Sequence, residues 1–527
     1  MFFDVWNHNK YMKSNFLKGA LVLIICNLVG KVLGAVYRIP LAGILGPVGM
    51  GMYQLVFPLY CLILTISTSG MPVAISKLVA ENNSKNQFNN SKKILKISLL
   101  ILTVISFIGA VLVVCFAKFI SKIQGNINIF ICYYGIAPAI LFVGMLSAFR
   151  GYFQGNLLMF PTALSSLVEN IVKMILGLIF ANRLVVFGVE YAVLGALVGV
   201  SISELISVIF LLICYFIFNK KKNKKSEFKS ESFKFLTRQI FSLAIPVTLG
   251  GLIAPITAMV DSLLIVNLLM FSGFSNTMAT TMLGIQSGIV EPLVNIPVII
   301  AVSISMVLLP NISKFSAENS RDKIKNIIEN SFQISLCISL TCAICFVIFG
   351  EQILKFLYGS ALKEDEIMIA TKLLFLGGFN IIFLSMVQVT AGALQGLGKT
   401  KEPVKSLIVG CIVKIVLDIV LVLIRPINIY GSVISGAVCY FVVFMLNYLR
   451  LKRLINVNLK DIFFYISIQE CLVCLFAFFA NKFCILLFSE TVSMFVAGVI
   501  TIAVFFVTYY VFFVYGKKDL DFEEKQI

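Results

Sequence analysis

The sequence predicts an all-α polytopic membrane protein with about fourteen transmembrane helices. Three observations support this fold class. Hydrophobic residues make up 59% of the 527 residues and charged residues only 13%, whereas a soluble domain carries about a quarter charged residues. So few polar residues cannot cover the surface of a water-soluble protein. Many apolar runs also reach the roughly 20 residues that a helix needs to cross the hydrocarbon core.

Fourteen apolar runs give the predicted spans in chain order. They are 16–39, 50–70, 94–117, 127–149, 161–182, 186–218, 240–269, 278–309, 329–350, 367–392, 404–424, 428–449, 461–480 and 491–515. Lys10 and Lys13 precede the first run, and Lys18 lies near its start. This run is too long for the apolar part of a signal peptide, so we expect it to remain as a span. Pro246 and Pro255 predict a bend in the seventh span.

Basic residues divide unevenly between the two sides of the predicted membrane. With the N-terminus placed inside, most of the 43 Lys and Arg residues fall in the inner segments and few in the outer ones. This is the positive-inside pattern, so we predict that both termini are cytoplasmic. Topology and contact with anionic lipids also account for the net charge of +18. A nucleic-acid partner is therefore not expected.

The thirteen cysteines raise the question of a metal site. Cys342 and Cys345 have the CxxC spacing, as do Cys471 and Cys474, but all four lie in apolar spans. Zinc needs about four converging ligands, and the only histidine is His8. We therefore interpret the cysteines as small apolar side chains and predict no metal site.

An internal repeat divides the chain. The segment "GYFQGNLLMFPTALSSLVENIVKMILG" aligns with "GALQGLGKTKEPVKSLIVGCIVKIVLD", which pairs Lys173 with Lys414. A second match, "ISKLVAENNS" from Ile75 with "ISKFSAENS" from Ile312, has nearly the same separation. Six spans separate the copies, so both copies face the same way. Spans one to six and seven to twelve are thus predicted to be parallel repeats, as in transporters.

The repeat sets the predicted domains. They are an N-terminal six-helix lobe at 1–218, a basic cytoplasmic linker at 219–238, a C-terminal six-helix lobe at 239–450, and two extra helices with a cytoplasmic tail at 451–527.

Charged side chains within the spans are the candidate functional residues, because each costs at least about 2.5–3.5 kcal/mol at mid-membrane and is usually kept for a function. The candidate substrate-binding residues are Lys31, Arg38, Lys173 and Lys414. The candidate ion-coupling or cavity carboxylates are Asp261, Asp418, Glu169 and Glu291.

Lys31 and Arg38 lie two helical turns apart on one face of the first span. Lys31 has no carboxylate three or four residues away. This cationic face indicates an anionic ligand, although Arg38 could instead be an interfacial residue at the end of its span.

Two further pairs, Glu169 with Lys173 and Lys414 with Asp418, have a four-residue spacing. Each could be an intrahelical ion pair that only neutralises charge. Each could also line a cavity in which the lysine meets an anion or the carboxylate takes a coupling cation. Asp261 has no such neighbour, so it either carries H⁺ or Na⁺ or makes a polar contact between helices.

Several segments resemble a known family: "GKVLGAVYRIPLAGILGPVGMGMYQLVFPLY", "GMPVAISKLVAEN", "RGYFQG" and "LVNIPVIIAVSISMVLLPNIS". They resemble the stage V sporulation protein B (SpoVB) branch of the polysaccharide transporters. This branch belongs to the multidrug/oligosaccharidyl-lipid/polysaccharide (MOP) flippase superfamily, which includes the lipid II flippase MurJ. The resemblance implies two six-helix lobes in a V and two C-terminal helices that form a groove for a lipid tail. It also implies translocation of undecaprenyl-pyrophosphate-linked sugars to the outer leaflet.

The resemblance assigns roles to individual residues. Lys31 takes the place of the first arginine in a cationic segment of the MurJ relatives, and Arg38 matches a second position approximately. The arginines that those relatives carry in spans two and eight are missing here, which leaves lipid II specificity open. Asp261 and Asp418 match carboxylates of a Na⁺ site, but Lys414 replaces its asparagine.

We therefore expect a monomeric flippase of the bacterial cell membrane that moves a polyisoprenoid-pyrophosphate-linked cell-wall precursor by alternating access. The SpoVB resemblance extends this to spore cortex peptidoglycan. No cofactor is expected beyond coupling to the membrane potential, H⁺ or Na⁺. The alternative is a MATE-like, cation-coupled multidrug exporter, which should have an acidic and aromatic cavity. An enzyme such as a glycan polymerase is not expected, because the outer loops are short and contain no histidine.

Overall fold

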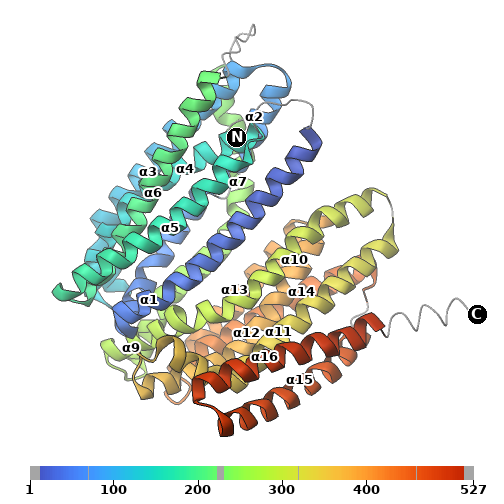
Figure 1. Ribbon diagram of the computed structural model, residues 1–527. Helices are drawn as coiled ribbons and strands as arrows, with labels where there is room; N and C mark the ends of the chain where they lie inside the picture. The colour runs from blue at the N-terminus through green and yellow to red at the C-terminus, as the bar shows by residue number, and fades with distance from the viewer. Residues whose placement is uncertain (1–11, 69, 222–230, 319, 458–459, 516–527) are drawn as a thin grey trace, which may run out of the picture. The chain divides into compact units, whose positions relative to one another are not determined.

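The structure is a computed structural model that describes residues 12–68, 70–221, 231–318, 320–457 and 460–515 (Figure 1). The predicted cytoplasmic ends, His8 and the central part of the predicted linker lie outside the described residues. Every element in the described part is helical. The chain forms two compact units, Met1–Leu264 and Ile265–Ile527.

The helices follow one another with short connections. The first unit contains α1 (Met12–Thr68), α2 (Met71–Ser84), α3 (Phe88–Ile123), α4 (Phe130–Gly155), α5 (Met159–Leu184), α6 (Val189–Lys221), α7 (Phe233–Gly251) and the start of α8 (Ile253–Phe271). The second contains the end of α8, α9 (Asn276–Leu283), the π-helical turn η4 (Gly284–Val290), α10 (Glu291–Ala317), α11 (Arg321–Tyr358), α12 (Glu364–Gly396), α13 (Lys401–Leu423), α14 (Ile429–Ile455), α15 (Lys460–Leu487) and α16 (Glu490–Tyr509).

The predicted all-α membrane fold with fourteen spans is confirmed. Twelve helices in the described part are long and apolar enough to cross a membrane. The two counts differ because the first and second predicted spans are both parts of α1. In addition, the seventh span is divided into α7 and α8 at Leu252, between Pro246 and Pro255, so that its long apolar stretch is only Pro255–Phe271. The bend predicted from these prolines is therefore observed.

The helix α1 consists of two arms that meet at Gly46. This residue has φ 63° and ψ 178°, outside the helical region, a conformation that is open to glycine and costly for other residues. Pro47 follows at once and cannot donate a backbone hydrogen bond. Together the two residues turn the chain without a loop.

The first arm of α1 runs parallel to α5. A Cβ atom at Gly30 would lie 2.8 Å from Asn170 Nδ2, and one at Gly177 would lie 2.5 Å from Tyr37 Oη. The numbering rises by seven on both helices between these two contacts. The first arm of α1 and the helix α5 therefore point the same way, as the first and fifth spans of an alternating topology must.

The second arm of α1 runs parallel to α6. Gly49 packs against Val189 near the start of α6, and Tyr60 reaches Glu204 further along it. Because α6 returns against α5 after a short connection, the two arms of α1 must themselves be antiparallel. Gly46 is thus where the chain reverses.

The core of the first unit is formed where α2, α3, α4, α6 and α7 meet. Ile75, Leu95, Phe153, Leu211 and Ile240 are buried there, one from each helix. Because α7 contributes to this core, it packs as part of the first unit. The boundary between the two units along the chain falls inside α8. The predicted domain boundaries, which rest on the repeat rather than on packing, stay a prediction.

The same helix packing recurs in the second unit. In the first unit α3 packs on α4, and α6 packs on both α4 and α5. In the second, α11 packs on α12, and α14 packs on both α12 and α13. The glycines of the repeat take equivalent places: Gly155 lies against Val79 of α2, and Gly396 lies against Ile312 of α10. The predicted pair of six-helix repeats is thus reproduced in three dimensions.

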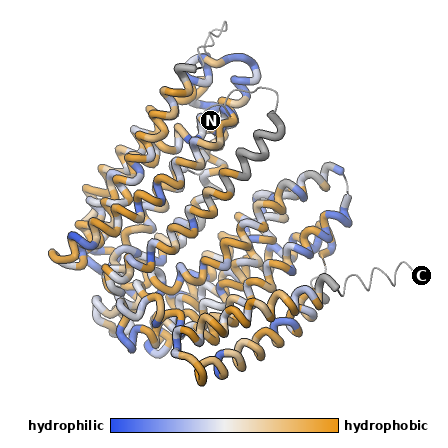
Figure 2. Tube along the Cα trace, viewed as in Figure 1, coloured by the Kyte–Doolittle hydropathy of each residue, from blue (hydrophilic) through white to orange (hydrophobic). Residues whose placement is uncertain are grey.

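The helices α15 and α16 are additional to the repeats, as predicted. They pack on α11 through Phe349, Ala477, Met494 and Ala497. Figure 2 shows hydrophobic residues along most of the helix lengths, with hydrophilic residues at several helix ends. Large apolar side chains such as Phe107 of α3 are exposed, which is expected for surfaces that contact lipid.

Candidate functional site

The structure places the candidate residues in both units. The first unit holds Lys31 and Arg38 on α1, Glu169 and Lys173 on α5, and Asp261 on α8; the second holds Glu291 at the start of α10, and Lys414 and Asp418 on α13.

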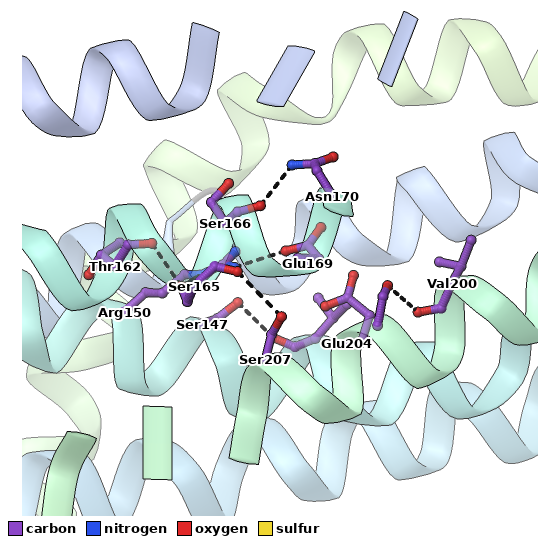
Figure 3. Close-up of polar contacts among 12 residues, drawn as sticks. Ser147, Arg150, Thr162, Ser165, Ser166, Glu169, Asn170, Val200, Glu204 and Ser207 are labelled. Atoms are coloured by element: carbon purple, nitrogen blue, oxygen red, sulfur yellow. Dashed lines mark hydrogen bonds and ion pairs between the residues drawn. The ribbon is translucent and has the colours of Figure 1, made fainter. Parts of the chain in front are cut away.

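An ion pair joins α4 and α5 in the first unit (Figure 3). Arg150 Nη2 lies 2.8 Å from Glu169 Oε2, and both side chains are largely buried. Arg150 Nε also donates to Ser165 Oγ at 3.1 Å. A guanidinium with two fixed partners is held in one orientation. Glu169 is therefore bound across the helix interface to Arg150.

Lys173 lies one turn beyond Glu169 on the same helix and is half-buried. Within the described ranges, the structure gives Lys173 no ion pair and no hydrogen bond from its side chain. The Cys61 thiol, on the second arm of α1, lies within electrostatic reach of both Lys173 and Arg38. Both cations therefore act electrostatically on the same residue of α1.

The levels of the cationic residues follow from the helix contacts. Gly30 lies beside Asn170 and Tyr37 beside Gly177. Along these parallel helices Lys173 therefore falls at a level between Lys31 and Arg38. Lys31 is exposed, whereas Arg38 is half-buried. The predicted cationic face of α1 and the lysine of α5 occupy the same length of the first unit.

A buried carboxylate lies near Lys173 and Glu169 of α5. Glu204 of α6 is only 2% exposed, and Tyr60 Oη donates to its Oε1 at 2.7 Å. In the described part of the chain its Oε2 is buried without a hydrogen-bond partner. Glu169, Arg150 and Lys173 all lie within electrostatic reach of Glu204, and Figure 3 shows Glu204 on α6 next to the turn of α5 that carries Glu169.

The lysine of the second repeat has a different environment. Lys414 Nζ lies 2.8 Å from Asp418 Oδ2, and these side chains are 11% and 1% exposed. The Ser435 hydroxyl of α14 donates to the other carboxylate oxygen of Asp418. The intrahelical pair that the spacing allowed is therefore present at this position, and both residues also take part in further interactions.

The two remaining candidate carboxylates are Asp261 and Glu291. Asp261 is half-buried, and Gln124 Nε2 lies 3.3 Å from the hydroxyl of the neighbouring Ser262. Glu291 is exposed and follows the π-helical turn η4. Both acidic residues take part in polar or electrostatic interactions in this structure. Their roles as coupling carboxylates stay predictions, as do the substrate-binding roles of the four basic residues.

Three partners could not be identified from the sequence pattern. Arg150 follows the predicted span 127–149 directly, but in the structure it lies inside α4. Tyr60 and Ser435 carried no signal of their own. The available signal was indirect: buried carboxylates such as Glu204 and Asp418 need donors, and those donors had to come from neighbouring helices.

Among the described residues, no three or more His, Cys, Asp or Glu side chains are grouped so that they could hold a metal ion. What the first unit offers is a short run of cationic side chains, with its carboxylates held by Arg150 and Tyr60. Such an arrangement can bind an anion.

Comparisons with known proteins agree with this architecture. The family described as "Polysaccharide biosynthesis protein" matches residues 16–316, which is more than half of the chain. The chain belongs to the polysaccharide biosynthesis protein family. The family described as "MatE" also matches residues 263–420. The membership in the MOP superfamily that the sequence segments indicated is thus confirmed.

Three relatives of this polysaccharide biosynthesis family member cover most of its length. Stage V sporulation protein B of Bacillus subtilis is 26% identical over 89% of this chain and 90% of its own. Lipid II flippase MurJ of the same organism is 28% identical over 84% of this chain and 83% of its own. A solved structure of lipid II flippase MurJ in an inward closed conformation matches 95% of this chain and 99% of its own, with a TM-score of 0.72 and 16% identity. The last match concerns the fold.

Proposed function

We propose that this protein is a flippase that moves a polyisoprenoid-pyrophosphate-linked cell-wall precursor or oligosaccharide from the inner to the outer leaflet by alternating access. One observation carries the proposal: Lys173, half-buried in a membrane helix, forms no direct ion pair among the described residues, and it lies at a level between Lys31 and Arg38. An uncompensated charge in such a place is costly unless a ligand uses it. The relative named as a lipid II flippase supports the same substrate class.

The electrical gradient favours this direction of transport. A pyrophosphate headgroup is an anion, and moving it outward across an inside-negative membrane releases about 2.3 kcal/mol per charge per 100 mV. The cationic residues would hold the anion in transit, with Arg38 able to make two parallel bonds to phosphate oxygens. No bound cofactor is needed for this step in the proposal.

The test is depletion of the protein, followed by analysis of the lipid-linked intermediates on the cytoplasmic leaflet. We expect one pyrophosphate-linked intermediate to accumulate there. The variants Lys31→Ala and Arg38→Ala should fail to restore its export while still inserting. Lys77→Ala is the matched control, because the Lys77 side chain is 57% exposed on α2, next to Glu81. Full export by the Lys31 and Arg38 variants would refute this binding role.

A second candidate function is a cation-coupled multidrug exporter. The match of the MatE family to residues 263–420 favours it, and so does the buried, partly unpaired carboxylate of Glu204. This function predicts that the protein protects cells against cationic dyes and leaves lipid-linked intermediates unchanged. The flippase proposal predicts the opposite pair of results, so one depletion strain distinguishes the two.

The biological setting is part of the proposal. We place the protein in the cell membrane as a monomer with both termini cytoplasmic, and we assign it to spore cortex peptidoglycan because of its similarity to stage V sporulation protein B. Fusion of a cytoplasm-dependent fluorescent reporter to each end tests the orientation. Deletion that impairs vegetative growth but leaves the spore cortex intact would contradict the assignment to sporulation.

A further inference from the structure

The ion pair between Arg150 and Glu169 has a consequence for Lys173. Glu169 and Lys173 are four residues apart on α5, the spacing at which oppositely charged side chains normally pair on a helix. Instead, Glu169 Oε2 lies 2.8 Å from Arg150 of α4, and Arg150 is fixed further by Ser165. Lys173 is left without an ion pair in the residues that the structure covers.

The other carboxylate at this level is also engaged. The contact of Gly199 with Gly177, and the hydrogen bond from Ser207 to the Ser165 carbonyl, show that α6 runs antiparallel to α5. Glu204 lies between these two contacts, level with the turn that carries Glu169 and Lys173. Tyr60 holds its Oε1 at 2.7 Å. Its Oε2 has no hydrogen-bond partner in the described part of the chain, and Lys173 lies within electrostatic reach of this carboxylate without forming an ion pair with it.

The second repeat provides an internal comparison. Lys414 occupies the position of Lys173, and Ala391 occupies the position of Arg150. Without an arginine at this position, the second repeat has no equivalent of the ion pair between Arg150 and Glu169. Lys414 is instead paired with Asp418 of its own helix at 2.8 Å. Two lysines that correspond in the repeat thus have opposite environments. The carboxylates differ as well as the arginine, because Gly410 stands at the position of Glu169 and Gly177 at that of Asp418.

We propose that Arg150 is a positioning residue that keeps Glu169 away from Lys173, so that the Lys173 ammonium is free to bind a phosphate oxygen of a pyrophosphate-bearing lipid. This inference rests on the proposed function for its ligand, but not for its geometry. Arg150 and Glu169 neutralise each other, so the charge offered to the ligand is that of Lys173. If Arg150 is removed, Glu169 can reach Lys173, and the ligand must then compete with a carboxylate that is always present.

The test uses the purified full-length protein in detergent and farnesyl pyrophosphate as the probe, with farnesol as the uncharged comparison. Arg150→Gln and Lys173→Gln should each weaken binding of farnesyl pyrophosphate about tenfold, the order expected for loss of one charge-assisted contact. The double variant Arg150→Gln/Glu169→Gln should bind as the wild type does, because nothing remains to neutralise Lys173. Lys414→Gln should have little effect, because Lys414 is already paired.

Two controls separate positioning from folding. Arg150→Lys keeps a cation that can hold Glu169, so it should preserve binding. If the double variant binds as weakly as Arg150→Gln, the arginine contacts the ligand itself or is needed for folding, and the positioning role is overturned. If Lys173→Gln binds as tightly as the wild type, the role of Lys173 is overturned as well.

A measurement without ligand distinguishes this inference from the proposed function. An amine-reactive reagent attacks only the neutral amine, and an ion pair favours the ammonium form. The rate of Lys173 modification, followed by mass spectrometry, should fall about threefold in Arg150→Gln and recover in the double variant. If the wild type binds farnesyl pyrophosphate no better than farnesol, the proposed function fails. The modification rates still test the positioning role of Arg150, and an unchanged rate in Arg150→Gln would overturn that role.

Discussion

Lys414 and Asp418 form an ion pair across one turn of α13, with 2.8 Å between Nζ and Oδ2 and with Asp418 only 1% exposed. Removing one partner of a buried pair leaves an uncompensated charge, which costs about 3–5 kcal/mol. We therefore expect Asp418→Asn to lower the free energy of unfolding in detergent by roughly that amount. The double variant Lys414→Met/Asp418→Asn should recover most of the loss.

A matched control lies on the same helix. Lys405 pairs with Glu402 at 3.2 Å, but its side chain is 63% exposed, and exposed pairs contribute about 0–1 kcal/mol. Lys405→Gln should therefore leave the unfolding transition nearly unchanged. Equal effects of Lys405→Gln and Asp418→Asn would show that burial does not decide the strength of the pair.

The pairs on α5 and α13 show how far a sequence pattern reaches. Both have the same four-residue spacing, and spacing correctly predicts that the two side chains share a helix face. It does not predict which pair forms. Glu169 binds Arg150 of a neighbouring helix, while Lys414 binds Asp418 of its own. The choice depends on what the adjacent helix presents, and one-dimensional periodicity carries no such information.

The spans and the repeat could be predicted because they depend on composition and order alone. A hydrophobic run that is long enough must cross the membrane, and matched segments that carry Lys173 and Lys414 take matched places. The hydrophobic pattern could not predict how the chain reverses within α1. The two arms were predicted as separate spans, but the φ of +63° at Gly46 that joins them without a loop is a backbone property.

The conformation of Gly46 leads to a second prediction. Its φ of 63° is unfavourable for any residue with a Cβ, although the space around it is open. Gly46→Ala should destabilise the protein by about 1–3 kcal/mol through backbone strain alone. Gly43, three residues earlier in the helical part of α1, has equally open surroundings. Gly43→Ala should be neutral or slightly stabilising, and thermal unfolding in detergent compares the two. A loss with Gly43→Ala as large as that with Gly46→Ala would contradict the strain argument.

The close contact between α5 and α6 leads to a third prediction. A Cβ atom at Gly199 would lie 2.5 Å from the Gly177 Cα atom, and a backbone atom cannot rotate away. Gly199→Ala should therefore separate these helices and cost about 1–3 kcal/mol. Gly498→Ala on α16, where no atom lies within 4 Å of the added Cβ, is the control. The measurement is the denaturant midpoint of both variants, and similar midpoints would show that α5 and α6 are not so tightly packed.

The contact between α11 and α15 leads to the last prediction. Thr341 Oγ1 lies 3.0 Å from each carboxylate oxygen of Glu470, which is 5% exposed. Thr341→Val keeps the shape but removes the donor, and an unsatisfied buried acceptor costs about 1–3 kcal/mol. We expect faster hydrogen exchange in α15 and a lower free energy of unfolding. Thr341→Val/Glu470→Met should restore both, because removing both polar groups leaves nothing unsatisfied.

The control for this contact is a threonine whose hydroxyl bonds within its own helix. In the part of the chain that the structure describes, Thr371 of α12 donates to the Ile367 carbonyl one turn earlier. Thr371→Val should therefore change neither exchange in α15 nor stability by more than about 0.5 kcal/mol. If Thr341→Val behaves like Thr371→Val, the hydroxyl does not stabilise the Glu470 carboxylate. Packing of Phe349 against Ala477 and Met494 would then be what holds α15 and α16 on the second unit.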